Sequence, residues 1–178
     1  DLPCMDDDAE RRGQPSVHIA YGEGPAVLVG DALLTEAFRT LVSTGLPTDI
    51  QVLLVLELTN AAGHVGMIGG QAADVGLGGP ILDLAELKRL HRGKTGALIS
   101  GACRMGAVAA GATRTQLDAI TVYGEAIGLA FQMADDVLDA EEDGGEEGPP
   151  SYVKLMGIEQ TQVAAATLLD EALQACSS

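Results

Sequence analysis

The sequence predicts an all-α protein in which helices pack on helices. Hydrophobic residues make up 47% of the 178 residues, whereas aromatic residues make up only 3%. The apolar side chains are therefore largely those of Ala, Leu, Val and Ile, which suit close contacts between helices. No segment of any length alternates apolar and polar residues, so we expect negligible β structure.

The first two helices are predicted from the spacing of apolar residues and from the turn between them. Residues 26–44 carry apolar side chains at helical spacing, and Gly-Leu-Pro at 45–47 is a stop followed by a restart. Thr48 is suited to cap the next helix, with Asp49 in its first turn. We expect this second helix to cover residues 48–74.

Four glycines near the end of this second helix indicate a close helix contact or a bend. They are Gly63, Gly66, Gly69 and Gly70. Each costs roughly 1 kcal/mol of helix stability relative to Ala, so we expect a structural reason for their grouping.

The remaining helices are expected at 83–110, 116–140 and 159–176. Residues 76–80 and 111–115 are predicted to be the loops between them. Residues 141–150 are acidic and of low complexity, and we expect them to be disordered and solvated.

The formal net charge of −16 excludes several classes of partner. Nucleic acids and anionic membrane surfaces are bound by Lys and Arg, so we expect neither as a partner. We find no run of about 18 apolar residues and expect no stable membrane insertion. The three cysteines lack the spacing of a metal site, which favours a reduced, cytoplasmic protein. The excess of Asp and Glu side chains forms either a solvated acidic surface or sites that bind cations.

The strongest local feature is an acidic group near the end of helix 116–140. Asp135 and Asp139 are four residues apart and share a helix face, with Asp136 beside them and Gln132 one turn earlier. Grouped carboxylate oxygens are ligands that suit Mg²⁺. The alternative is an acidic helix end, although acids near a helix C-terminus oppose the helix dipole.

A second acidic group opens the chain. Asp1 and the three aspartates at 6–8 precede Arg11 and Arg12. Such a group is either a set of mutually satisfied surface charges or a site where acids hold cations and Arg binds phosphate oxygens.

A third feature is the segment His-Arg-Gly-Lys-Thr-Gly at 91–96. It lacks the frame of a phosphate-binding loop and follows no strand, but Lys94 and Thr95 can still reach a diphosphate from a helix. Taken together, two acidic groups, separate basic groups and a helical scaffold indicate Mg²⁺-assisted ionisation of a diphosphate ester.

The sequence resembles the trans-isoprenyl diphosphate synthase family, in particular the bacterial farnesyl and geranylgeranyl diphosphate synthases. The motifs that carry this resemblance are DLPCMDDD with RRG at 1–13, GDALL at 30–34, GGQAAD at 69–74, KTGALI at 94–99, and GLAFQ with DDVLD at 128–139. The resemblance implies an antiparallel helical bundle of the isoprenoid synthase type around a central cavity.

The resemblance also implies the ligands of the metal, which would be Mg²⁺. These are Asp1, Asp6, Asp135, Asp136 and Asp139, with Asp6 and Asp135 binding directly.

The resemblance implies substrate-binding residues as well. Arg11 would bind an allylic diphosphate and Arg12 would bind isopentenyl diphosphate. Lys94, Thr95 and Gln132 would face the allylic substrate as the catalytic residues, and Gln71 would line the same cavity.

The expected reaction condenses isopentenyl diphosphate with dimethylallyl, geranyl or farnesyl diphosphate. We expect residues 1–178 to be a single catalytic domain that lacks its N-terminal helices, because the chain starts within an acidic motif and without Met. We also expect a homodimer. Two alternatives are a non-catalytic regulatory subunit of a heteromeric synthase and a class I terpene cyclase.

Overall fold

The computed structural model describes residues 1–77, 79–81, 83–143 and 150–177 of the chain. The prediction of an all-α fold is confirmed: the strands among the described residues are one antiparallel pair of two residues each, β1 (Glu10–Arg11) and β2 (Gln14–Pro15). The chain forms two compact units, Asp1–Gln51 and Val52–Ser178. The expected single catalytic domain remains a prediction.

The first unit carries the acidic opening and two helices. After the short β pair come α1 (Val17–Tyr21) and α2 (Glu23–Val42). Helix α2 confirms the predicted helix at 26–44, with both ends shifted by two or three residues. Helix α1 was not predicted, because it is short and lies in a stretch punctuated by Gly and Pro.

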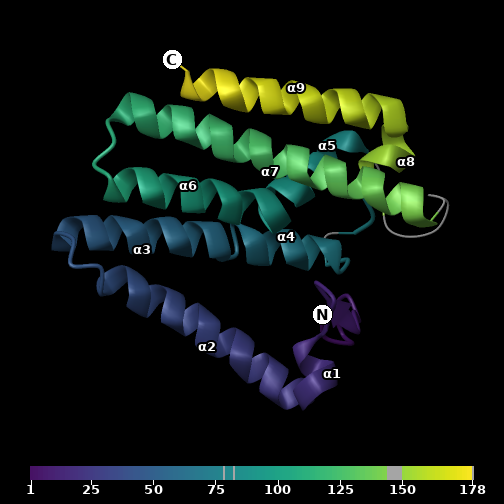
Figure 1. The fold of residues 1–178 in the computed structure, drawn as a ribbon, viewed down its shortest axis with the longest axis horizontal. Helices are drawn as coiled ribbons and strands as arrows, with labels where there is room; N and C mark the ends of the chain where they lie inside the picture. The colour runs from purple at the N-terminus through teal and green to yellow at the C-terminus, as the bar shows by residue number, and fades with distance from the viewer. Residues whose placement is uncertain (78, 82, 144–149, 178) are drawn as a thin grey trace. The chain divides into compact units, whose positions relative to one another are not determined.

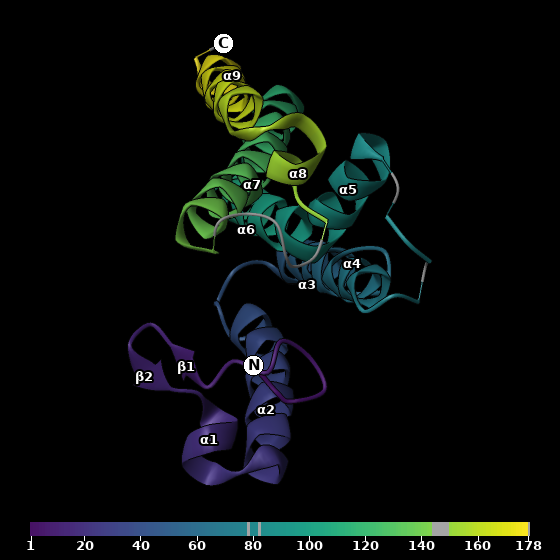
Figure 2. The same cartoon turned by 90° about the vertical axis from the view of Figure 1, so that its right-hand side faces the viewer.

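The second unit is built around one long helix. Its elements are α3 (Thr48–Ala62, which starts in the first unit), α4 (Met67–Asp74), α5 (Leu84–His91), the π-helical segment η1 (Arg92–Gly96), α6 (Ala97–Ala109), α7 (Arg114–Asp143), α8 (Tyr152–Met156) and α9 (Ile158–Cys176). Figures 1 and 2 both show α7 between α6 and α9. Helix α7 also contacts η1, α5 and α8, so it is the central element of this unit.

The predicted helix at 48–74 is wrong as a single element. The chain leaves helical geometry between α3 and α4, where Gly66 has φ −119° and ψ −125°. A side chain at Gly66 would collide with the carbonyl oxygens of Asn60 and Ala61. The bend that the four glycines indicated is therefore confirmed.

The predicted helix at 83–110 has the right limits and the wrong interior. It is divided into α5, η1 and α6, and η1 has the wider π-helical turn. The predicted helices at 116–140 and 159–176 are confirmed as α7 and α9. The predicted acidic loop at 141–150 falls largely on residues 144–149, which lie outside the described residues.

The core of the second unit joins four helices at one end of α7. Leu87 of α5, Met133 of α7 and Tyr152 of α8 are each at most 1% exposed and pack together. Leu168 of α9 packs against them. This cluster holds the short helix α8, which the sequence did not predict, against α7.

Within the part of the chain that the structure describes, one stretch has the length and apolar composition of a membrane span, contrary to the expectation from the sequence. It is Thr48–Asp74, which comprises α3, the bend at Gly66 and α4, and 28% of its most apolar window is buried. A single stretch of this kind is weak evidence for a membrane span, because core helices of soluble proteins have the same length and composition. Within it, Glu57 pairs with Arg104 of α6, which places this part of α3 in contact with protein.

Candidate active site

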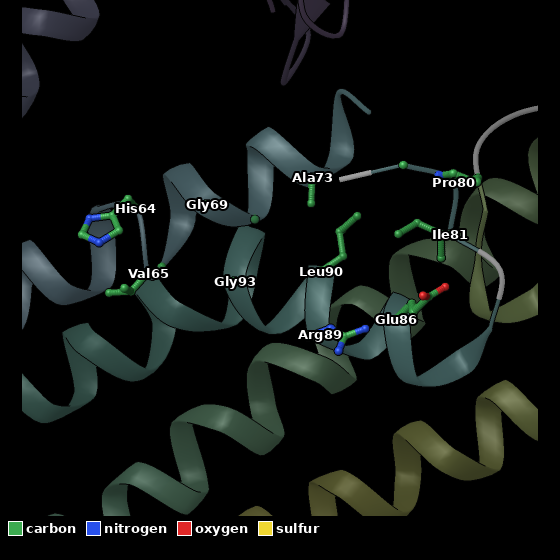
Figure 3. Close-up of a pocket in the computed structure, with 13 residues that line it drawn as sticks. His64, Val65, Gly69, Ala73, Pro80, Ile81, Glu86, Arg89, Leu90 and Gly93 are labelled. Atoms are coloured by element: carbon green, nitrogen blue, oxygen red, sulfur yellow. The ribbon is translucent and has the colours of Figure 1, made fainter. Parts of the chain in front are cut away.

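Two pairs of glycines bring three elements of the second unit into backbone contact. The first pair is Gly70 of α4 and Gly93 of η1. A methyl group built on Gly93 would lie 3.0 Å from the Cα of Gly70, and one built on Gly70 would lie 2.5 Å from the carbonyl carbon of Gly93. Only glycine allows the two backbones to approach this closely. Figure 3 shows Gly93 beside α4, close to Gly69.

This first contact places a predicted catalytic residue against a carboxylate. Asp74 lies one helical turn after Gly70, on the same face of α4, and Lys94 directly follows Gly93. The Nζ atom of Lys94 donates to Oδ2 of Asp74 at 2.6 Å. Asp74 is the last residue of the GGQAAD motif at 69–74, and nothing in the sequence indicated its role.

The second pair, Gly96 and Gly128, brings the backbone of η1 equally close to α7. A methyl group on Gly128 would lie 2.7 Å from the Cα of Gly96. Gln132 lies one turn after Gly128, and Thr95 directly precedes Gly96. The Oγ1 atom of Thr95 donates to Oε1 of Gln132 at 3.0 Å.

The π-helical segment therefore presents neighbouring residues to different helices. Lys94 pairs with α4 and Thr95 with α7, while the backbone of η1 contacts both. Short π-helical segments occur frequently at functional sites. The structure thus brings Thr95 and Gln132, two of the residues predicted to be catalytic, into contact, while Lys94, the third, neighbours Thr95 in the chain and pairs with Asp74.

A hydrogen-bond chain continues from this cluster to α8. The Nε2 atom of Gln132 donates to Oδ1 of Asp136 at 3.4 Å, and the backbone N–H of Tyr152 donates to Oδ2 of Asp136 at 2.6 Å. Asp136 is only 8% exposed, and burial raises the pKa of its carboxyl above the usual value. The carboxylate of Asp136 therefore anchors α8 and orients the Gln132 amide.

The other two aspartates of this group face outward. Asp135 and Asp139 are exposed and lie one turn apart on α7. Among the described residues, no three His, Cys, Asp or Glu side chains gather closely enough to hold a metal ion alone. Two carboxylates fit Mg²⁺, because proteins hold this ion through one or two carboxylates together with waters and substrate phosphates. The metal-binding roles of Asp135, Asp136 and Asp139 remain predictions.

A buried aromatic pair forms where α5 meets η1, between His91, the last residue of α5, and Tyr152 of α8. The rings of His91 and Tyr152 lie 5.2 Å apart at an angle of 54°. Burial lowers the pKa of His91 to about 4, with smaller and opposed effects from Asp74 and Lys94, so the ring is neutral at neutral pH. Burial likewise raises the pKa of Tyr152. The sequence carried no signal for this pair, because Tyr152 follows the acidic segment and belongs to no motif.

A second charged contact joins the helices α3, α6 and α7. Two guanidinium nitrogens of Arg104 on α6 donate to the carboxylate of Glu57 on α3, at 2.8 and 2.6 Å. A third nitrogen donates to the Thr121 hydroxyl on α7 at 2.6 Å. The Arg104 guanidinium holds the pKa of Glu57 below its usual value. One side chain thus joins three helices.

The residues predicted in the first unit lie on its acidic opening. A guanidinium nitrogen of Arg11 lies 3.8 Å from Asp1 Oδ1 and 3.5 Å from Asp8 Oδ2, in exposed ion pairs. Arg12 has a φ of 54°, in the left-handed region. Asp6 is exposed. The proposed roles of Asp1, Asp6, Arg11 and Arg12 remain predictions.

A cavity of about 450 Å³ lies beside α4 and α5, and none of the predicted site residues lines it. His64 and Ala73 border one side and Arg89 and Leu90 the other (Figure 3). Gln71, which was predicted to line the substrate cavity, lies half-buried on α4 directly after Gly70. Its predicted role remains a prediction.

Known proteins are similar in sequence to this chain. Farnesyl diphosphate synthase of Escherichia coli is 43% identical over 188 residues, covering 98% of this chain and 63% of the relative. Geranylgeranyl pyrophosphate synthase 11 of Arabidopsis thaliana is 38% identical, covering 98% of this chain and 53% of the relative. The chain thus spans between half and two thirds of the length of these relatives.

Solved structures of similar proteins have the same fold over nearly the whole chain. The apo FPP/GFPP synthase of Zymomonas mobilis superposes with a TM-score of 0.89 at 38% identity, over 99% of this chain and 63% of that one. A geranyltransferase of Helicobacter pylori, complexed with magnesium and isoprenyl diphosphate, superposes with a TM-score of 0.86 at 39% identity, over 98% of this chain and 60% of that one. Residues 1–171 match the polyprenyl synthetase family model. The chain belongs to the polyprenyl synthetase family.

Proposed function

We propose that the protein is a Mg²⁺-dependent trans-prenyltransferase that condenses isopentenyl diphosphate with an allylic diphosphate and releases diphosphate. The observation that carries this proposal is η1, held by two glycine contacts, where Thr95 bonds Gln132 one and two turns before the exposed Asp135 and Asp139 and the adjacent Lys94 pairs with Asp74. Family membership and the names of the relatives support the same reaction class.

The residues of the second unit have distinct proposed tasks. The Lys94 ammonium donates to the diphosphate oxygens of the allylic substrate and shares the negative charge that develops there. Thr95 and Gln132 face the same substrate, and their mutual hydrogen bond holds both side chains in one arrangement. Preorganised donors of this kind cost little reorganisation when the reaction occurs.

The proposed reaction proceeds by ionisation of the allylic diphosphate. The bond between C1 and the diphosphate oxygen breaks, and its electron pair leaves with the diphosphate. The double bond of isopentenyl diphosphate then attacks C1, and the adduct loses a proton, for which diphosphate oxygen is the proposed acceptor. Asp135 and Asp139 would hold Mg²⁺, which supplies positive charge to the departing diphosphate.

Residues of the acidic opening complete the proposal. Asp1 and Asp6 are proposed as further metal ligands, Arg11 as a ligand of the allylic diphosphate and Arg12 as a ligand of isopentenyl diphosphate. The chemistry of these side chains supports the assignment, because carboxylates suit Mg²⁺ and guanidinium groups bind phosphate oxygens in pairs. We also propose a cytoplasmic homodimer.

Product analysis tests the proposed reaction. The purified protein is incubated with Mg²⁺, isopentenyl diphosphate and, in turn, dimethylallyl, geranyl and farnesyl diphosphate. Diphosphate release and a longer prenyl diphosphate on chromatography are expected with at least one primer. Cyclic hydrocarbons from an allylic diphosphate alone would indicate a terpene cyclase instead. Absence of diphosphate release with all three primers contradicts the proposal.

A further inference from the structure

Asp74 is a carboxylate in close contact with the proposed catalytic lysine, and it has no task among the proposed substrate and metal ligands. Its Oδ2 atom lies 2.6 Å from Nζ of Lys94, and the two side chains are 28% and 32% exposed. The pair links the last residue of α4 to the middle of η1, across 20 residues of sequence.

The position of Asp74 is unfavourable without this partner. Asp74 lies at the C-terminus of α4, where the helix dipole is negative and opposes a carboxylate. The glycine contact between Gly70 and Gly93 compensates by bringing the Lys94 ammonium next to it. The local structure therefore serves the pairing of Asp74 with Lys94 rather than the stability of α4 alone.

The pairing leaves Lys94 able to bind an anion. An ammonium group has three N–H donors and no acceptor, so one donor can bond Asp74 while two remain for diphosphate oxygens. The lysine side chain is flexible, and ordering it costs conformational entropy, which lowers the affinity for the substrate. The ion pair with Asp74 already orders the side chain before the substrate binds, so less entropy is lost on binding.

We propose that Asp74 is a positioning residue that holds the Lys94 ammonium ready for the diphosphate of the allylic substrate. This inference rests on the proposed function for the identity of the substrate. It separates Asp74 from the residues that touch the substrate, because Asp74 acts through Lys94.

Two other conceivable roles of Asp74 predict results that differ from those of positioning. If Asp74 contributed only its negative charge, removing that charge would reduce repulsion of the diphosphate and tighten its binding. If the pair only joined α4 to η1, replacing Asp74 would lower Tm and would change the kinetics of both substrates together. Positioning instead predicts weaker binding of the allylic diphosphate alone, with Tm retained and with the effect dependent on Lys94.

The test compares Asp74→Asn, Lys94→Met and the double variant in the purified protein. Steady-state kinetics give KM for each substrate and kcat, titration calorimetry gives the affinity for inorganic diphosphate, and thermal unfolding gives Tm. For Asp74→Asn we expect about a tenfold rise in KM for the allylic diphosphate, equivalent to 1.4 kcal/mol. KM for isopentenyl diphosphate and Tm should change little, and Asp74→Glu should restore most of the loss.

Asp118→Asn is the matched control. It removes the carboxylate of the Arg114–Asp118 ion pair, which lies in the first turns of α7, far from Gln132 on the same helix. Residues 118 and 132 are about 21 Å apart along that helix at 1.5 Å per residue. The control therefore changes the net charge equally, and we expect unchanged kinetics. Asp74→Ser replaces Asp74→Asn if the latter does not fold.

The outcomes separate this inference from the proposed function. In the Lys94→Met background, Asp74→Asn should cause no further loss of affinity for the allylic diphosphate. The inference is overturned if Asp74→Asn weakens this affinity equally in both backgrounds. It is also overturned if Asp74→Asn tightens diphosphate binding. If the wild-type protein elongates no primer, the proposed reaction fails, and the calorimetric affinity alone decides. A tenfold weaker diphosphate affinity that requires Lys94 then supports positioning, and an unchanged affinity refutes it.

Discussion

Replacing Gly70 with alanine tests the close contact on which the candidate site depends. The added methyl group would lie 2.5 Å from the carbonyl carbon of Gly93 and 2.6 Å from the Cα of Lys94, and closer still to the Lys94 nitrogen. All three atoms belong to the backbone, so no side chain can rotate away. The two helical segments must move apart instead.

The expected cost is the difference between two effects. Overpacking of this kind costs about 3 kcal/mol, at the upper end of its usual range, because three backbone atoms are in conflict at once. Alanine regains about 1 kcal/mol of helix propensity over glycine. The free energy of unfolding of Gly70→Ala should therefore fall by about 2 kcal/mol, which lowers Tm by about 4–8 °C for a chain of this size.

Urea and thermal unfolding, followed by circular dichroism, measure this change. Gly106→Ala on α6 is the matched control, since a methyl group there would meet nothing within 4 Å. The control should be unchanged or up to about 1 kcal/mol more stable. Separation of the segments should also lengthen the Asp74–Lys94 contact and reduce activity. A Gly70→Ala protein as stable as Gly106→Ala would refute the close contact.

The remaining predictions concern charge. His91 has a folded pKa of about 4 against an ordinary 6.5, so the unfolded chain binds more protons between these values and stability should fall as the pH drops through this window. His91→Phe should flatten that part of the stability profile measured by urea unfolding, and an identical profile would contradict the assignment. Arg104→Met leaves Glu57 without its partner and should lower the free energy of unfolding by about 2 kcal/mol, with partial recovery in the double variant Arg104→Met/Glu57→Leu. Asp135→Asn should reduce turnover by at least about 100-fold and weaken Mg²⁺ affinity in calorimetry while Tm is retained; near-normal turnover would refute its role.

The helices of this chain were largely predictable, whereas the geometry of η1 was not. The segment 83–110 has apolar residues at helical spacing, and the structure is helical over 84–109. A π-helical turn adds one residue to a single turn, which hardly alters the spacing of side chains over a long segment. The π-helical turn coincides with the contact of Gly93 with Gly70, which lies 23 residues away in the sequence and leaves no trace in local periodicity.

The acidic group on α7 was only partly predictable. Helical periodicity correctly placed Asp135 and Asp139 on one face. It gave no means of knowing that Asp136 is buried, because its burial results from the contact with Tyr152 of α8. Helix α8 has five residues and follows the acidic segment, so no periodic signal predicted it.

The helical class of the protein, its motifs and the residues that can carry the chemistry were all evident from the sequence. Those properties follow from local periodicity and from the chemical nature of Lys94, Thr95, Gln132 and the aspartates. The pairing of Lys94 with Asp74 and of Thr95 with Gln132 became visible only in the folded arrangement of the helices. These pairs depend on which glycines meet across α4, η1 and α7, and such contacts between distant segments are set by packing rather than by local spacing.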